Sequence, residues 1–136
     1  MFKWRDAYSV NVRTIDEQHK MLFKIGRELG DLVSIEGDHF DEIMAILNRL
    51  KDYTVFHFNE EEELMEKYGY PEIEKHRLEH KYFVSKINEL DKEDEVDEEQ
   101  KKISMEIITF IANWIENHIL KTDQRYSKFF NDKGIY

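Results

Sequence analysis

The sequence contains no cysteine and very little proline or glycine. Without cysteine, the chain can form no disulfide, thiolate nucleophile, iron–sulfur cluster or cysteine-ligated zinc site. One proline and five glycines in 136 residues, with 37% charged residues, favour long exposed helices over a sheet. Apolar runs are only a few residues long, so no segment is expected to span a membrane.

Positive charge is also scarce, because 30 acidic residues face 20 basic ones and give a formal charge of −10. Such a field repels phosphate backbones, so nucleic acid is not an expected partner. The first ten residues carry charges and lack the apolar segment of a signal peptide, so we expect a cytoplasmic protein. No surface is marked for a protein partner, and we expect a monomer.

The apolar pattern predicts an all-α protein, with the whole chain forming one domain. Residues 1–13 lack a helical period and are expected to pack as an extended arm across the helices. Alternating spacings of three and four predict the helices, which run over about 14–36, 39–68, 71–91 and 98–130. Short connections between them predict an up-down-up-down antiparallel four-helix bundle.

Local signals mark the helix ends. Thr14, followed three residues later by Glu17, fits a capping box at the start of the first helix. Pro71 suits the first turn of the third helix, where its missing N–H costs nothing. The acidic residues 91–99 lack the spaced ligands and the glycine of an EF-hand, so a solvated turn is expected there.

Metal-ligand side chains interrupt the apolar faces of these helices. His57 and Glu61 are four residues apart, as are His76 and His80, so each pair lies on one helical face. Five of the six histidines occupy core-facing positions, together with two acids. The full set of candidate ligands is His19, His57, Glu61, His76, His80, His118 and Asp123. Glu60, Glu62, Glu63 and His39 fall outside the stripes and are interpreted as surface residues.

Counting residues from the turns places the first three helices' candidates level with one another. The same count leaves His118 about 15 Å from this level, at about 1.5 Å per residue, so the fourth helix must overhang the third or the turn must lie elsewhere. Beyond His118 the apolar pattern resumes one residue late, at Asp123. On a regular helix these two side chains would point about 140° apart. One π-turn would align them, and the alternative is a helix that ends or kinks near Thr122.

A buried cluster of this composition requires a cation. Burying an unpaired carboxylate costs several kcal/mol, against a net domain stability of about 5–15 kcal/mol. Five imidazoles and two carboxylates exceed what one ion can hold, so two ions with bridging carboxylates are expected. Imidazole with carboxylate suits iron, manganese or zinc.

Four segments of the sequence together resemble the hemerythrin family, and specifically its single-domain bacterial members, the bacteriohemerythrins. They are IDEQHKMLF around His19, HFNEEE from His57, HRLEH from His76 and WIENHILKTDQRY from Trp114. Each segment alone is a weak signal. Their order and spacing are specific, and every ligand position of the family pattern is filled.

The resemblance implies a non-haem di-iron site that binds dioxygen. It assigns His76, His80 and His118 to one iron, and His19 and His57 to the other. Glu61 and Asp123 would bridge the two irons together with an oxo or hydroxo group, and the iron with two histidines would keep an open position for dioxygen.

The residues around the ligands suggest a dry pocket for dioxygen. Phe58, Trp114, Ile115 and Ile119 lie one to four positions from ligand residues, and an apolar wall would keep water and protons from the bound gas. Ordinary core packing is the alternative role for these side chains. An acid such as Glu17 is expected to orient the free ring nitrogens.

The predicted function is reversible dioxygen binding, for transport, storage or scavenging, without catalysis. A sensor of oxygen, nitric oxide or iron is one alternative, although 136 residues leave no room for an output domain. A di-iron redox enzyme is the other, but such sites use Glu-x-x-His pairs and more carboxylates than this histidine-rich set of candidate ligands contains.

Overall fold

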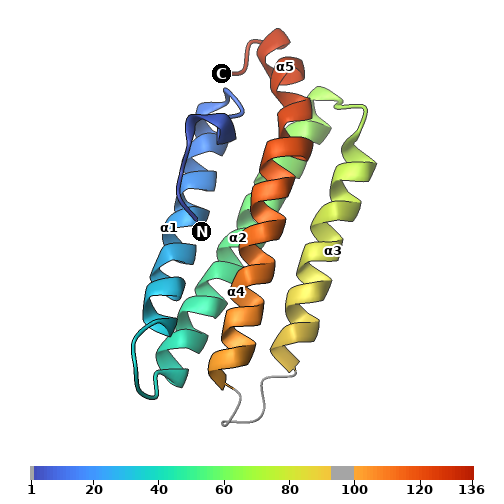
Figure 1. Cartoon of the computed structure of the whole chain (residues 1–136). Helices are drawn as coiled ribbons and strands as arrows, with labels where there is room; N and C mark the ends of the chain where they lie inside the picture. Colours follow the sequence, from blue (N-terminus) through green and yellow to red (C-terminus); the bar gives the residue numbers. More distant parts are fainter. Residues whose placement is uncertain (1, 93–99) are drawn as a thin grey trace.

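The computed structural model describes residues 2–92 and 100–136, and the predicted acidic turn lies largely outside them (Figure 1). Helices α1 and α3 run in one direction and α2 and α4 in the other, so the predicted antiparallel four-helix bundle is confirmed. The elements are η1 (Asp6–Tyr8), α1 (Arg13–Val33), α2 (Phe40–Tyr68), α3 (Ile73–Lys92), α4 (Gln100–Asn117), the π-helix η3 (His118–Asp123) and α5 (Gln124–Asp132). None of these described helices is long and apolar enough to cross a membrane.

The turn between α2 and α3 is made by Gly69, Tyr70 and Pro71. Gly69 has a φ of +71°, a left-handed conformation that ends α2 at low cost only with glycine. The Tyr70 N–H then donates to the carbonyl of Met65 at 2.9 Å. Helix α3 begins at Ile73, so Pro71 lies in the turn and not in the first helical turn that the sequence suggested.

The N-terminal arm packs against α1 as expected, but α1 is not capped as the sequence predicted. The residue before the helix is Val12, which has no side chain that could cap it, and Thr14 lies exposed inside the first turn. Instead Asp16 accepts hydrogen bonds from the Ser9 hydroxyl at 2.6 Å and the Val10 N–H at 2.8 Å. The carboxylate that follows the start of α1 therefore fastens the arm to the helix.

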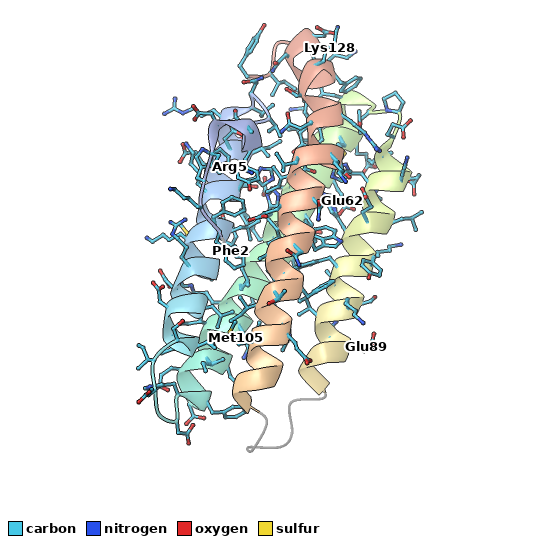
Figure 2. The ribbon with its side chains drawn as sticks, viewed as in Figure 1. Phe2, Arg5, Glu62, Glu89, Met105 and Lys128 are labelled. Atoms are coloured by element: carbon cyan, nitrogen blue, oxygen red, sulfur yellow. The ribbon has the colours of Figure 1, made fainter. Side chains whose placement is uncertain are left out.

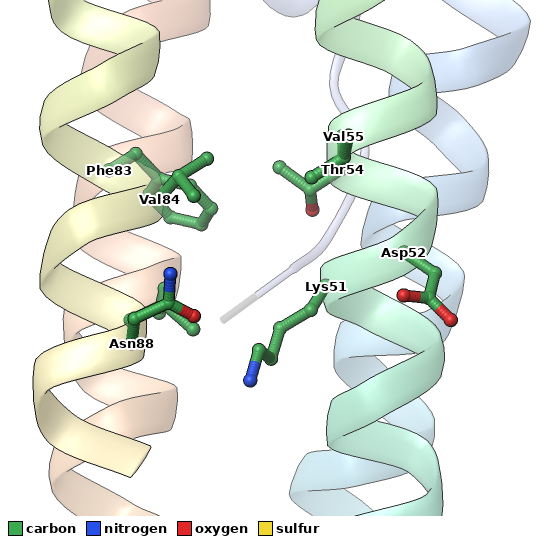
Figure 3. Close-up of a pocket in the computed structure, with 8 residues that line it drawn as sticks. Lys51, Asp52, Thr54, Val55, Phe83, Val84 and Asn88 are labelled. Carbon is green, nitrogen blue, oxygen red and sulfur yellow. The ribbon is translucent and has the colours of Figure 1, made fainter. Parts of the chain in front are cut away.

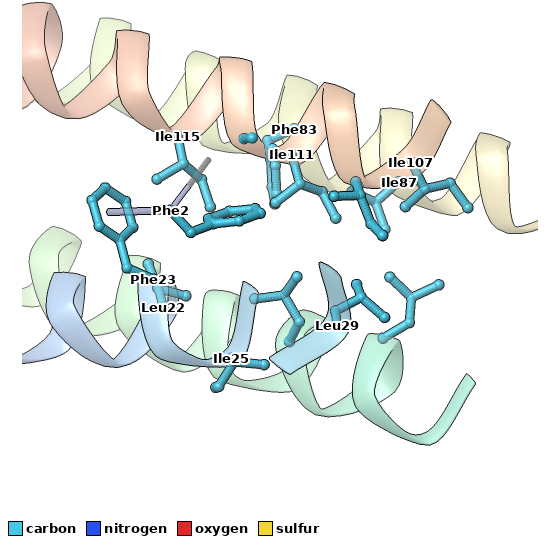
Figure 4. Close-up of a cluster of buried hydrophobic side chains, with 14 of the residues drawn as sticks. Phe2, Leu22, Phe23, Ile25, Leu29, Phe83, Ile87, Ile107, Ile111 and Ile115 are labelled. Carbon is cyan, nitrogen blue, oxygen red and sulfur yellow. The ribbon is translucent and has the colours of Figure 1, made fainter. Parts of the chain in front are cut away.

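Side chains fill the space between the helices (Figure 2), and the buried apolar ones form two clusters, of which Figure 4 shows the larger. The larger cluster includes Leu22 on α1, Phe58 on α2 and Ile119 in η3. The smaller one includes Ile15 on α1, Met65 on α2 and Tyr126 on α5. His19, Glu61 and Asp123 each fall between these pairs in sequence, so a polar layer separates the two clusters.

The arm ends in a close approach of Phe2 to Gly26. Phe2 is buried and contacts Phe23 edge to face, with the ring centroids 6.2 Å apart. A Cβ added at Gly26 would lie 2.5 Å from Cδ1 of Phe2, whereas one at Gly30 would meet none of the described atoms within 4 Å. The missing side chain of Gly26 thus leaves the space that the Phe2 ring occupies.

Substituting the two glycines should give opposite results. Gly26→Ala should destabilise the fold by about 1 kcal/mol, because overpacking costs about 1–3 kcal/mol and helix propensity returns about 1 kcal/mol. Gly30→Ala, one turn along the same helix, should stabilise it by up to about 1 kcal/mol. Urea unfolding followed by circular dichroism measures both, and equal midpoint shifts in one direction would contradict the close packing.

Candidate metal centre

Seven buried polar side chains converge in the layer between the apolar clusters. Every residue of the predicted set is present, and each is at most 5% exposed. They come from each long segment of the bundle: His19 from α1, His57 and Glu61 from α2, His76 and His80 from α3, and His118 and Asp123 from η3. The structure therefore brings together all seven residues that the sequence predicted as candidate metal ligands.

The side chains fall into two groups, each able to hold one metal ion. In each group the candidate ligand atoms lie within 4.8 Å of one another. The first group is Glu61, His76, His80 and His118, and the second is His19, His57, Glu61 and Asp123. Glu61 belongs to both groups, which is the position of a bridging carboxylate.

Asp123 also faces both groups. Its Oδ1 lies 3.0 Å from His76 Nε2 and 2.9 Å from His118 Nε2, while its Oδ2 lies 3.2 Å from His19 Nε2. Glu61 approaches His57 and His80 through Oε1, at 3.1 and 3.4 Å. Two carboxylates thus stand between five imidazoles, close enough to both groups that each could bridge two metal ions.

These short distances do not correspond to satisfied hydrogen bonds. Among the side chains that the structure describes, the buried nitrogen and oxygen atoms without a hydrogen-bond partner belong to His19, Glu61, His76, Glu79, His80, His118 and Asp123. Buried polar atoms are normally paired, and leaving one unpaired costs about 1–3 kcal/mol. Because these lone pairs face shared space, the set fits a cation that would satisfy them together.

The π-helix aligns the last two candidates, as predicted. Residues 118–123 form η3, so His118 and Asp123 point to one side although they are five positions apart. His118 also lies level with α3, with its ring centroid 5.1 Å from that of His80. The 15 Å offset obtained by counting therefore does not separate His118 from the other candidates, as expected if the fourth helix overhangs the third or the turn lies elsewhere.

Hydrogen bonds from outside the site orient two of the five rings, and a third ring lies near another carboxylate; the sequence did not identify these contacts. Gln18 Oε1 lies 2.7 Å from His57 Nδ1, and Glu62 Oε2 lies 2.9 Å from His80 Nδ1. Such contacts fix the tautomer that leaves Nε2 free to bind a metal. Glu17, the acid suggested by the sequence, is exposed, and Glu62 is not the solvated surface residue that its position off the stripe indicated.

The third contact depends on the π-turn. Thr122 is buried and donates its hydroxyl to Glu79 Oε1 at 3.1 Å. The other oxygen of Glu79 lies 3.7 Å from His118 Nδ1. Thr122 therefore holds the carboxylate of α3 against the histidine of η3.

Aromatic rings cover each histidine of the first group. Phe58 stacks on His80 with centroids 3.8 Å apart, Trp114 stacks on His118 at 4.4 Å, and Tyr126 stacks on His76 at 5.6 Å. Phe58, Ile115 and Ile119 are also buried, as expected of the predicted apolar wall. In the second group, His19 and His57 meet each other edge to face at 4.6 Å.

Tyr126 is the residue of the site that the sequence analysis missed. Its phenol donates a short hydrogen bond to Glu61 Oε2, and its ring is fully buried. Burial, together with the charges of Asp123 and Glu61, raises the pKa of the phenol well above its usual value. The sequence did contain a signal for this residue. Tyr126 lies three residues after Asp123, on the apolar pattern that resumes there one residue late.

The electrostatics follow from the mutual proximity of acids and imidazoles. Burial acts to raise the pKa of Glu61 and of Asp123, but the neighbouring histidines hold both well below their usual range. Burial lowers the pKa of His57. His80 is also desolvated, but its contacts with Glu61 and Glu62 outweigh this and raise its pKa to about 9. Both carboxylates thus remain anionic and available to cations.

Fold and site together define a class, the helical-bundle proteins with a buried cluster of histidines and carboxylates that could hold metal ions. Residues 10–130 match the family model described as the hemerythrin HHE cation binding domain. With this match over most of its length, the chain belongs to the hemerythrin family, and the resemblance seen in the sequence is confirmed.

Individual relatives support the assignment. The chain is 37% identical over 128 residues to a bacteriohemerythrin from Clostridium acetobutylicum, covering 93% of this chain and 98% of that protein. It is 28% identical over 125 residues to a myohemerythrin from Theromyzon tessulatum, covering 92% and 90% of the two chains. A crystal structure of wild-type hemerythrin is similar with a TM-score of 0.77 and 31% identity, covering 93% of this chain and 95% of that one.

Removing the charge of Glu62 should lower the pKa of His80 in the metal-free protein. A raised histidine pKa stabilises the fold below the ordinary value of 6.5, and this contribution disappears as pH rises through about 9. In Glu62→Gln, the pH at which this stabilisation is lost should fall from about 9 toward 6.5. Nuclear magnetic resonance titration of the His80 ring measures the shift, and an unchanged midpoint would contradict the role given to Glu62.

Proposed function

We propose that the protein binds dioxygen reversibly at a non-haem di-iron centre. His76, His80 and His118 would hold one iron and His19 and His57 the other, with Glu61 and Asp123 bridging them. The observation that carries the proposal is that two groups of candidate ligands share Glu61, while Asp123 faces histidines of both. When bound, a pair of ferrous ions supplies the two electrons and the open position that reversible binding of dioxygen requires.

The rings around the site support an assignment of the open position to the second group. Phe58, Trp114 and Tyr126 stack on the three histidines of the first group and restrict their movement. The second group has two histidines in place of three. With Glu61 and Asp123 shared by both groups, it would therefore have one protein ligand fewer. We therefore place the gas beside His19 and His57.

Reversibility requires that few protons reach the bound gas, because protonation would release it as a reduced product. Phe58, Trp114, Ile115 and Ile119 supply an apolar wall on one side of the site. The phenol of Tyr126, a proton donor next to the centre, is held on Glu61 Oε2 and has a raised pKa. The apolar wall would thus limit the access of water, and the phenolic proton stays on the Tyr126 oxygen, directed at the Glu61 carboxylate.

The relatives are named bacteriohemerythrin and myohemerythrin, which favours a carrier over the two alternatives. A carrier needs a gas site, a pair of irons and a dry wall, and it needs no acid or base that reaches a substrate. The proposal therefore assigns no catalytic residue. A di-iron enzyme or a sensor would share the same centre but would convert or report its ligand.

The spectrum of the iron-loaded protein tests this function. After anaerobic reduction with two ferrous ions per chain, adding dioxygen should produce a charge-transfer absorption that disappears when the gas is removed. Repeated cycles should return the same amplitude. Rapid oxidation to a stable ferric form, with no band that deoxygenation reverses, would rule out a carrier.

The ligand assignment can be tested with two histidine variants. His118→Ala should lower the iron content from two ions per chain, because His118 Nε2 lies in the first group. His39→Ala is the matched control, since His39 precedes α2 and contacts the carbonyl of Glu36, outside the site. Metal analysis after gel filtration measures both, and two tightly held ions in His118→Ala would contradict the assignment.

A further inference from the structure

A groove between α2 and α3 leads from the surface to one of the candidate ligands. It consists of two cavities of about 230 and 410 Å³ that share Val55 and Val84 and therefore adjoin. Figure 3 shows the first, with Thr54 and Val55 on α2 opposite Phe83 and Val84 on α3. The second continues along the same two helices to Phe58 and His80.

The floor of this groove belongs to the hydrophobic core. Phe83 and Ile87 are each 2% exposed, and Thr54 turns its hydroxyl away by donating to the carbonyl of Leu50 at 2.7 Å. Phe83 touches Phe58 with ring centroids 5.8 Å apart, and Phe58 in turn lies flat on His80. Phe83 and Phe58 thus lie between the first cavity and the metal centre, whereas the second cavity reaches His80 itself.

The end of the groove nearest the centre has a fixed rim. Arg77 donates to Glu62 at 3.2 Å and to Glu66 at 3.1 Å, both on α2, and to Glu74 at 2.7 Å on its own helix. These bonds tie α2 to α3 at the level of His80. Because the guanidinium is held by three carboxylates, it stays at the rim.

A second opening beside the centre has different chemistry. A cavity of about 180 Å³ reaches His118 and is lined by Glu79, Asn117, Lys121, Thr122 and Arg125 together with Trp114. Charged and amide groups hold water strongly, so an apolar molecule gains little by entering there. The groove between α2 and α3 also has charged and amide groups along its edges, namely Lys51, Asp52, Asn88, Asn59, Glu62, Arg77 and Lys81. Between them it has a continuous set of apolar side chains, Val55, Phe58, Phe83, Val84 and Ile87, whereas the cavity beside His118 has only Trp114.

We propose that the groove between α2 and α3 is a binding and entry site for dioxygen, from which the gas passes Phe58 to the centre. The inference rests on the proposed function. Dioxygen is small and apolar, and a cavity of about 150 Å³ lined by leucine, isoleucine and phenylalanine is large enough to bind xenon. The first cavity exceeds that size, and the second extends it to His80.

An entry route has a kinetic signature that distinguishes it from the binding site itself. Narrowing the route slows entry and exit by the same factor, so the equilibrium affinity does not change. A residue that contacts the bound gas would instead change the ratio of the two rate constants. The rates must therefore be measured separately.

Val55→Trp is the decisive variant, because Val55 lines both cavities and is 44% exposed, so the change leaves the core intact. We expect its association and dissociation rate constants for dioxygen to fall together by about tenfold. Leu78→Trp is the matched control on α3, where the side chain is 66% exposed and lines neither cavity. Val84→Phe narrows the groove from its other wall and should act in the same direction.

The competing route is tested with Asn117→Trp in the cavity beside His118. Stopped-flow mixing and flash photolysis of the iron-loaded variants give the two rate constants. Wild-type rates in both Val55→Trp and Val84→Phe would overturn the proposal. So would a slowing found in Asn117→Trp and not in those two variants.

Xenon provides a second measurement that does not depend on iron or on reversible oxygenation. In protein loaded with diamagnetic Zn(II), xenon pressure should shift the methyl resonances of Val55, Val84 and Ile87, and Val55→Trp should abolish the shifts of Val84 and Ile87. Unshifted methyls would overturn the groove as a gas site. If xenon binds there while the iron protein fails to release dioxygen, the carrier function falls and the gas site stands.

Discussion

The structure depends on two carboxylates buried among five imidazoles. Glu61 and Asp123 cannot lose their water without partners, and the partners come from each long segment of the bundle. Even in the folded bundle, several of these buried nitrogen and oxygen atoms lack a hydrogen-bond partner. Bound cations would satisfy them and offset the cost of burial. Helix length, the π-turn and the ring contacts all serve to place those groups in one layer.

Much of the site was predictable from the sequence, because polar ligand-type side chains occur at positions where the helical period indicates the core. His57 and Glu61 occupy positions where the helical pattern requires apolar residues, and this conflict identifies them without knowledge of the fold. The single-residue shift between His118 and Asp123 predicted the π-helix for the same reason. The position of a residue on an apolar stripe depends only on the period of its own helix. Such residues can therefore be found from a single sequence.

The contacts that no single helix determines were not predicted. Gln18, Glu62 and Glu79 lie off the apolar stripes, and their roles depend on how neighbouring helices are rotated and shifted. The level of α4 likewise follows from side-chain packing and could not be counted from the turns. At the start of α1, the arm supplied donors to Asp16 that a local capping rule does not consider.

The polar layer also divides the molecule into two parts, each with its own apolar cluster, and one cluster is larger than the other. The smaller apolar cluster joins the start of α1, the end of α2 and α5, including Ile15, Met65 and Phe130. Cations in the layer would connect ligands from both sides of it, so the two parts would be expected to unfold as one unit. Without them, the buried atoms that lack hydrogen-bond partners weaken the layer, and we expect amide hydrogen exchange to begin in the smaller part.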